Sequence, residues 1–227
     1  YRLLVAPMLF LLKDGVAERL KSFVQNGGTL VMTYLSAYVD ENNACFFGGN
    51  PGGKMLRELF GIWSEDIDGL EPQVRQSFDY RGVRREVRDY AEYLHAEGAE
   101  VLAAYNSEFY AGSPALTVNR FGLGQAFYIG ARTGLEFLTD FYGELLESCG
   151  ISPVLPGVPE ALAASRRIGR DGSEYYFLLN LTPEEQRWPL PFPMEDLWNG
   201  KGEIAELLLP PSGSTVLKRK AEGAPAV

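Results

Sequence analysis

Two cysteines and one histidine are the side chains that first suggest nucleophilic chemistry in this sequence. A reactive thiol needs a basic neighbour or a helix N-terminus to ionise near neutral pH. Cys45 lacks the glycine-flanked turn that exposes a nucleophile, and Cys149 falls at the end of an expected helix, where the dipole disfavours a thiolate. His95 has no evident partner in the sequence. We therefore expect all three residues to be structural.

Phosphate-binding loops and metal sites are the next kinds of site to consider. The turn Gly122-Leu123-Gly124 begins like a phosphate-binding loop, but position 127 is Phe where a third glycine is needed. The turn also joins two segments of strand character, so we expect a hairpin. No spacing typical of a P-loop, a metalloprotease or a zinc site occurs. We expect no cofactor and no metal.

Charge and length narrow the classes of partner. The 227 residues carry a formal net charge of −9, which argues against nucleic acid and anionic lipid as partners. The longest apolar run, residues 3–12, is too short to cross a membrane, and no small-residue cleavage site follows it. Two cysteines do not make a disulfide framework. We therefore predict a cytoplasmic protein.

The elements that would position these residues begin with a β-α-β pattern. Residues 3–7 form an apolar run typical of a strand covered on both faces, residues 16–24 have apolar side chains at helical spacing after Asp14, and residues 29–34 predict a second buried strand. A unit of this length makes the two strands parallel neighbours. Because chain ends usually lie at the surface, a sequence that starts in a central strand is expected to belong to a longer protein.

Helices and strands follow in mixed order. A long loop at residues 35–53, rich in Gly, Asn and acidic residues, is expected to be functional or an interface element. Residues 84–95 fit both a helix and a strand, and that choice stays open. The other expected elements are a short helix at 54–60, a strand within 67–78, a strand at 99–105, a hairpin at 115–129 and a helix at 134–149.

Three prolines between residues 152 and 159 predict a linker, after which the pattern changes. A hairpin is expected over residues 161–181, and short strands should follow it, so the second part is expected to be small and antiparallel. We place the domains at residues 1–154 and 155–220, with a loose tail at 221–227.

Short motifs follow one another along nearly the whole chain. They are YRLLVAPM at the start, GGTLV at 27–31, VDEN at 39–42, GNPG at 49–52, LFGI at 59–62, EDID at 65–68, EGAEVL at 97–102, FYAGSPA at 109–115, NRFGLGQAFYIG at 119–130 and EYYFLLN at 174–180. Each motif alone is weak, but their joint order resembles the C-terminal part of glycoside hydrolase family 42 β-galactosidases.

The resemblance implies a fold and an assembly. Residues 1–154 would be the trimerisation domain without its first strand and helix, an α/β domain with a parallel sheet, similar to class I glutamine amidotransferases and flavodoxin-like. The second part would be the small C-terminal β domain. The family's catalytic (β/α)8 barrel lies N-terminal to both. The chain's partners would be its own barrel and sibling subunits in a homotrimer, with a β-galactoside as substrate of the parent enzyme.

Retaining hydrolysis of terminal β-D-galactosyl residues needs two carboxyl groups about 5–5.5 Å apart. Asp40 and Glu41 are adjacent, so their side chains diverge on an extended segment, and the acidic stretch at 65–68 has the character of a solvated or interface loop. We therefore expect no catalytic residue in this chain. Two other classes stay open, a stand-alone carbohydrate-binding or regulatory module without enzymatic activity and an active amidohydrolase.

Polar and aromatic side chains in or near the long loop are the candidate site residues. Exposed aromatic residues in a patch usually mark an interface, and in the family neighbouring subunits wall off one another's active-site clefts. The aromatic residues of 174–180 alternate as a half-buried strand requires, so we expect them to pack in a core. The candidates for subunit contact are Asp40, Glu41, Asn42, Phe46, Phe47 and Trp63.

Overall fold

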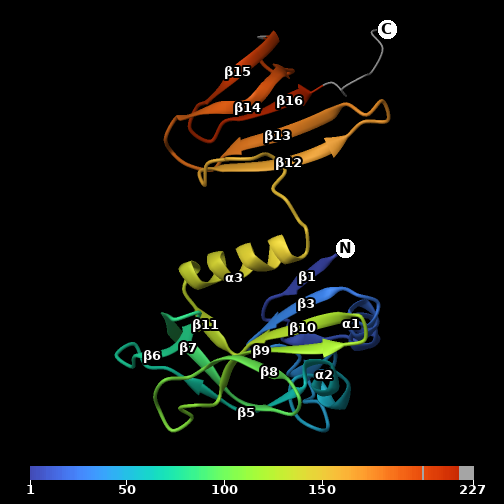
Figure 1. Cartoon of the computed structure of the whole chain (residues 1–227), viewed down its shortest axis with the longest axis vertical. Helices are drawn as coiled ribbons and strands as arrows, with labels where there is room; N and C mark the ends of the chain where they lie inside the picture. Colours follow the sequence, from blue (N-terminus) through green and yellow to red (C-terminus); the bar gives the residue numbers. More distant parts are fainter. Residues whose placement is uncertain (201, 220–227) are drawn as a thin grey trace. The chain divides into compact units, whose positions relative to one another are not determined.

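The computed structural model describes residues 1–200 and 202–219, and the chain divides into two units. The first unit spans Tyr1–Ile151, and the second begins at Ser152 (Figure 1). The domain limits predicted from the sequence, 1–154 and 155–220, stay a proposal, and the predicted tail at 221–227 lies outside the described residues.

A mixed five-stranded sheet forms the centre of the first unit. Its spatial order is β1 (Leu3–Ala6), β3 (Thr29–Thr33), β10 (Gly124–Ile129), β9 (Pro114–Phe121) and β8 (Glu100–Ala104). The first three strands are parallel, whereas β9 and β8 run antiparallel to their neighbours. Helix α1 (Val16–Gln25) connects β1 to β3, which confirms the predicted β-α-β unit. β1 lies at the edge of the sheet, so Val5 is partly exposed and the expected cover on both faces is not found.

Helices cover both faces of this sheet, as Figure 1 shows. α1 and α2 (Gly53–Phe60) pack on one face in a core that includes the fully buried Leu30, Leu56 and Tyr128. α3 (Leu135–Ser148) packs on the other face, where the Phe141 ring meets the Phe127 ring edge to face. The predicted helices at 16–24, 54–60 and 134–149 are therefore confirmed.

A second, antiparallel sheet extends the first unit. It contains β11 (Ala131–Thr133), β7 (Val83–Ala96) and β5 (Ile62–Gly69), and β6 (Gln76–Tyr80) pairs with the first half of β7. Residues 84–95, which fit both a helix and a strand, lie inside the 14-residue strand β7. A short parallel pair joins β2 (Leu11–Leu12), which follows β1, to β4 (Val39–Asp40), which lies in the long loop.

The predicted parallel, flavodoxin-like fold of the glutamine amidotransferase type is wrong. Strands hold 48% of the residues and helices 15%, whereas an alternating α/β fold has a helix after most strands. The β-α-β pattern ends at β3. Later strands are joined by tight turns, as at Arg81 and Gly82 (φ 50° and 77°), and a tight turn makes neighbouring strands antiparallel.

The second unit is a single antiparallel sheet. Its spatial order is β12 (Leu162–Ile168), β13 (Glu174–Asn180), β16 (Ser214–Arg219), β14 (Gln186–Asp196) and β15 (Gly202–Leu209). Alternate side chains of β13 point to opposite faces, so Tyr176 and Leu178 are buried with Trp188 while Phe177 is partly exposed.

Candidate functional site

The segment between β3 and α2, residues 34–52, forms the long loop that the sequence predicts as an interface element. We name it the β3–α2 loop. Near its start, Leu35 and Ala37 have φ values of 58° and 54°, a left-handed conformation that side chains with a Cβ rarely adopt. The Ala37 N–H donates to the Leu9 carbonyl at 2.7 Å, and the Tyr38 N–H donates to the Phe10 carbonyl at 3.0 Å. These bonds anchor the start of the loop to the segment that follows β1.

A buried carboxyl group also supports the start of the loop. Glu92 of β7 is fully buried, and its Oε1 accepts hydrogen bonds from the Leu35 N–H at 2.8 Å and the Tyr38 hydroxyl at 3.2 Å. Burial raises the pKa of Glu92 to about 7, although the Leu35 N–H acts to lower it. The hydroxyls of Tyr128 on β10 and of Tyr38 act in the same direction as the Leu35 N–H.

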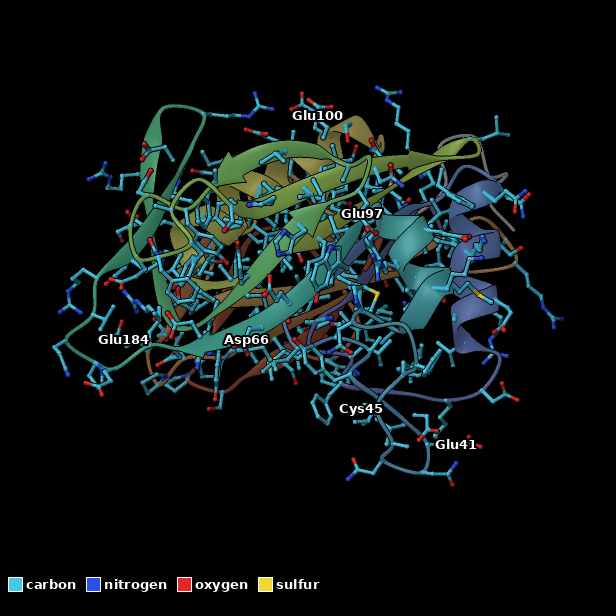
Figure 2. The ribbon with its side chains drawn as sticks, turned by 90° about the horizontal axis from the view of Figure 1, so that it is seen from below. Glu41, Cys45, Asp66, Glu97, Glu100 and Glu184 are labelled. Atoms are coloured by element: carbon cyan, nitrogen blue, oxygen red, sulfur yellow. The ribbon has the colours of Figure 1, made fainter. Side chains whose placement is uncertain are left out.

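Asp40 shapes the middle of the loop. Its Oδ1 accepts hydrogen bonds from the backbone N–H groups of Ala44 at 2.9 Å and Asn42 at 2.8 Å, and these bonds lower the pKa of Asp40. Glu41 and Asn42 are exposed. Figure 2 shows Glu41 and Cys45 on the part of the loop that projects from the unit. The Asp40 carboxylate therefore stabilises the loop itself, whereas Glu41 and Asn42 stay accessible to a partner.

The two adjacent phenylalanines of the loop have different environments. Phe46 is half-buried and packs against the core that lies under α1 and α2. The side chain of Phe47 is fully exposed. Of these two candidates, Phe47 is the one that presents a large apolar surface to solvent.

Three further apolar side chains lie beside the start of the loop, and the sequence pattern did not single them out. Met8, Phe10 and Leu11 are 40–46% exposed, and the Phe10 ring stacks on the Tyr38 ring with centroids 6.0 Å apart. These residues belong to the apolar run at 3–12 but lie beyond residues 3–7, the part that the pattern predicts as a buried strand. The length of that run was a usable signal, because the strand β1 needs only four of its residues.

Trp63 of β5 is enclosed in a stack of side chains. Its ring stacks on the His95 ring with centroids 4.5 Å apart, and the Arg57 guanidinium lies 5.3 Å from its centre. Arg57 also donates to both carboxylate oxygens of Glu97 and, at 3.0 Å, to the Gly48 carbonyl. The indole therefore has stacking and cation–π partners within the chain, and Trp63 is half-buried. Trp63 on β5 is thus linked to His95 on β7 and, through Arg57 of α2, to the loop.

The candidates for nucleophilic and acid–base chemistry are dispersed. His95 Nε2 lies 2.6 Å from Glu65 Oε2, a partner that the sequence did not reveal. Cys45 is exposed on the loop, Cys149 is the C-cap of α3, and both are free thiols. Within residues 1–200 and 202–219, no group of three or more His, Cys, Asp and Glu side chains could hold a metal ion. In the same ranges, no helix is long and apolar enough to cross a bilayer.

A groove of about 730 Å³ lies between α3 and the C-terminal ends of β1 and β3. Parallel strands often bind ligands at this end of a sheet. The lining is mostly apolar, with Val5, Met8, Tyr34 and Tyr142 among its members, and it includes no carboxyl group. The groove therefore does not supply the paired carboxyl groups that glycoside hydrolysis requires.

Residues 1–152 match the sequence profile of the β-galactosidase trimerisation domain. The chain belongs to this family. Membership in the trimerisation-domain family confirms the resemblance inferred from the order of the sequence motifs.

The chain is similar to parts of longer proteins. It is 39% identical to β-galactosidase Pbg of Clostridium perfringens and 40% identical to β-galactosidase BglY of Alicyclobacillus acidocaldarius, in both cases over 97% of its own length. It spans 33% of the length of each of these curated relatives.

Solved structures give the same result. Gan42B, a GH42 β-galactosidase from G. stearothermophilus, has a TM-score of 0.86 at 40% identity, covering 97% of this chain and 32% of that one. A β-galactosidase from Bacillus circulans has a TM-score of 0.84 at 34% identity, covering 96% of this chain and 33% of that one.

Proposed function

We propose that this chain is the non-catalytic assembly region of a homotrimeric β-galactosidase that hydrolyses terminal β-D-galactosyl residues with retention. The observation that carries the proposal is the match of residues 1–152 to the trimerisation domain. The alignment of nearly the whole chain with a third of each related β-galactosidase supports it. The two carboxyl groups of retaining hydrolysis would then belong to a catalytic barrel N-terminal to this region. The partners would be that barrel and two sibling subunits, in the cytoplasm.

The subunit contact that we propose centres on the apolar side chains at and beside the β3–α2 loop. Phe47, Met8, Phe10 and Leu11 expose apolar surface, and its removal from water would stabilise association. The polar residues of the loop, Asp40, Glu41 and Asn42, would surround this apolar centre, as polar residues do at the rim of most interfaces. Phe46 and Trp63 would contribute indirectly by holding the loop in place.

Two measurements on the purified chain test this function. Sedimentation equilibrium should give a species of three times the chain mass that dissociates on dilution, and a monomer at every concentration would contradict the assembly role. A chromogenic β-galactoside should not be hydrolysed by the chain. Hydrolysis at a rate proportional to chain concentration would contradict the non-catalytic role.

One exposed tryptophan favours a second candidate, a carbohydrate-binding or regulatory module without enzymatic activity. The Trp198 side chain is 64% exposed, and the backbone at Trp198 and Asn199 is fixed by N–H donation to Asp196. An exposed indole on an anchored turn is a surface on which a sugar ring can stack. Saturable heats in a calorimetric titration with galactose, lost in Trp198→Ala, would support this candidate. The absence of heat at millimolar galactose would remove it.

A further inference from the structure

The start of the β3–α2 loop has a strained backbone that depends on contacts from other elements. Ser36, between the two left-handed residues Leu35 and Ala37, is fully buried, and its hydroxyl accepts a hydrogen bond from the Leu9 N–H at 3.1 Å. The Leu35 N–H donates to the carboxylate of Glu92 on β7. A strained conformation of this kind persists only while its surroundings hold it. Glu92 therefore helps to determine the shape of the loop.

The surroundings of Glu92 oppose a negative charge. The ionisable groups that face it, among the residues described, are the phenols of Tyr38 from the loop, Tyr105 from β8 and Tyr128 from β10. Burial raises the pKa of each phenol, so all three are neutral at physiological pH. From β5, the Ser64 hydroxyl lies 3.3 Å from the Tyr38 hydroxyl. No cationic side chain contributes to the pKa of Glu92.

A carboxylate in such a site has lost its hydration, and it accepts hydrogen bonds from neutral donors, Leu35 and Tyr38 at Oε1 among them, without a counter-ion. Its charged form is therefore penalised much more than its neutral form. The penalty disappears when water hydrates the carboxylate. Detachment of the loop from β7 would expose the carboxylate to water, because the loop supplies both donors to Oε1.

We propose that Glu92 is a proton-controlled latch for the β3–α2 loop. Protonated Glu92 keeps the loop closed on β7. Loss of the proton to solvent favours an open loop, in which the carboxylate is hydrated and the Leu35 N–H is released.

The direction and range of the effect follow from the two proton affinities. The closed state holds its proton with a pKa of about 7, against an ordinary value of 4.5 for the hydrated carboxyl of the open state. The open state therefore gains population as pH rises between these values. Its equilibrium constant should rise about tenfold per pH unit from pH 5 to pH 7 and level off above pH 7.

Hydrogen–deuterium exchange of the full chain from pH 5 to pH 8.5 tests the latch. Exchange of peptides covering residues 34–52, corrected for the intrinsic pH dependence of amide exchange, should follow this profile in the wild type. In Glu92→Gln the corrected profile should be flat, because the amide does not ionise. Glu100→Gln, which changes an exposed glutamate on β8, should keep the wild-type profile. A flat wild-type profile, or a wild-type slope in Glu92→Gln, would overturn the proposal.

A second variant keeps the test decisive if Glu92→Gln does not fold. Tyr38→Phe removes one donor to Glu92 Oε1 but leaves the carboxyl group in place. Its loop should open several-fold more than that of the wild type at each pH while the pH dependence remains. Loss of the pH dependence in this variant would contradict control by Glu92.

The latch and the proposed assembly role can fail separately. Sedimentation at the same pH values reports the oligomer, whereas exchange of residues 34–52 reports the loop. A loop that opens with rising pH in an unchanged trimer would support the latch and contradict the loop as a subunit contact. A monomer whose loop shows the same pH profile would support the latch and contradict the assembly role.

Discussion

Arg57 on α2 and Glu97, just after β7, form a bidentate ion pair with Nη2–Oε1 and Nε–Oε2 distances of 2.5 and 2.8 Å. Hydrogen bonding within the pair raises the pKa of Arg57 and lowers the pKa of Glu97. Both side chains are partly exposed, so solvent screens the attraction between their charges. The pair matters mainly for geometry, because the same guanidinium contacts Trp63 and the Gly48 carbonyl.

We expect Arg57→Lys to lower the free energy of unfolding by about 1 kcal/mol. A lysine ammonium cannot make the bidentate pair, reach Gly48 and cover the Trp63 ring together. Urea unfolding followed by tryptophan fluorescence measures the loss. The control is Arg84→Lys, because Arg84 makes a single 3.4 Å contact with Asp79 on the surface, and it should cost less than about 0.5 kcal/mol. Equal losses in the two variants would contradict the role of the Arg57 contacts.

Glu92→Gln should change how global stability depends on pH. The folded-state pKa of Glu92 is raised from 4.5 to about 7, so the folded state binds the proton more tightly than the unfolded state. Wild-type stability should therefore fall as pH rises from about 4.5 to 7, by about 3 kcal/mol in total, and stay level above that. Gln keeps a neutral acceptor for Leu35 and Tyr38 and has no proton to lose.

Urea unfolding at pH 5 and pH 8 checks the Glu92 prediction. Between pH 5 and pH 8 the wild type should lose more unfolding free energy than Glu92→Gln does. Glu100→Gln, at an exposed glutamate, is the control and should behave as the wild type does. Other groups titrate in both proteins, so the difference between the two profiles isolates Glu92. Identical pH profiles in the wild type and Glu92→Gln would contradict the raised pKa.

The part of the fold that could be predicted from the sequence is the part set by local periodicity. α1, α2 and α3 each have a helical apolar pattern and a glycine at or just after their C-terminal end. β1, α1 and β3 are also close to one another in the sequence. β7 could not be assigned, since residues 84–95 also have helix-like spacing. Residues 84–95 form a strand because they pair with β5 and β6, and this pairing has no signal in the local sequence.

The candidate site was harder to predict for the same reason. A glutamate in a charged stretch is normally exposed, and nothing beside Glu92 in the sequence indicates that the β3–α2 loop and tyrosines of β8 and β10 surround it. Trp63 was predicted as a contact residue because it lies near the long loop, and its stacking with His95, 32 residues further along the chain, has no signal in the local sequence. Phe47 is exposed in the structure, but its proposed contact with another subunit remains to be tested.

Gly124→Ala should destabilise the first unit strongly. A Cβ at position 124 would lie 2.2 Å from the Gly28 carbonyl oxygen and 2.3 Å from the Val24 carbonyl oxygen, so α1 and β10 would have to move apart. We expect a loss of about 2–3 kcal/mol in the free energy of unfolding, the range for overpacking in a core. The control is Gly143→Ala, on the exposed side of α3 with no atom within 4 Å, which should gain up to about 1 kcal/mol. Thermal denaturation compares the two, and an unchanged Gly124→Ala would contradict the close approach.

Phe47→Asp should weaken self-association of the chain without altering its fold. Phe47 is fully exposed and makes no contribution to the core, so its replacement should leave the thermal midpoint of the dissociated chain unchanged. If the side chain is buried between subunits, losing about 2 kcal/mol of burial free energy at each contact raises the dissociation constant about 30-fold. Sedimentation equilibrium measures that constant. Leu123→Asp, at another exposed apolar residue on the β9–β10 turn, is the matched control and should associate as the wild type does. Equal weakening by both variants would indicate a general charge effect instead of a contact at Phe47.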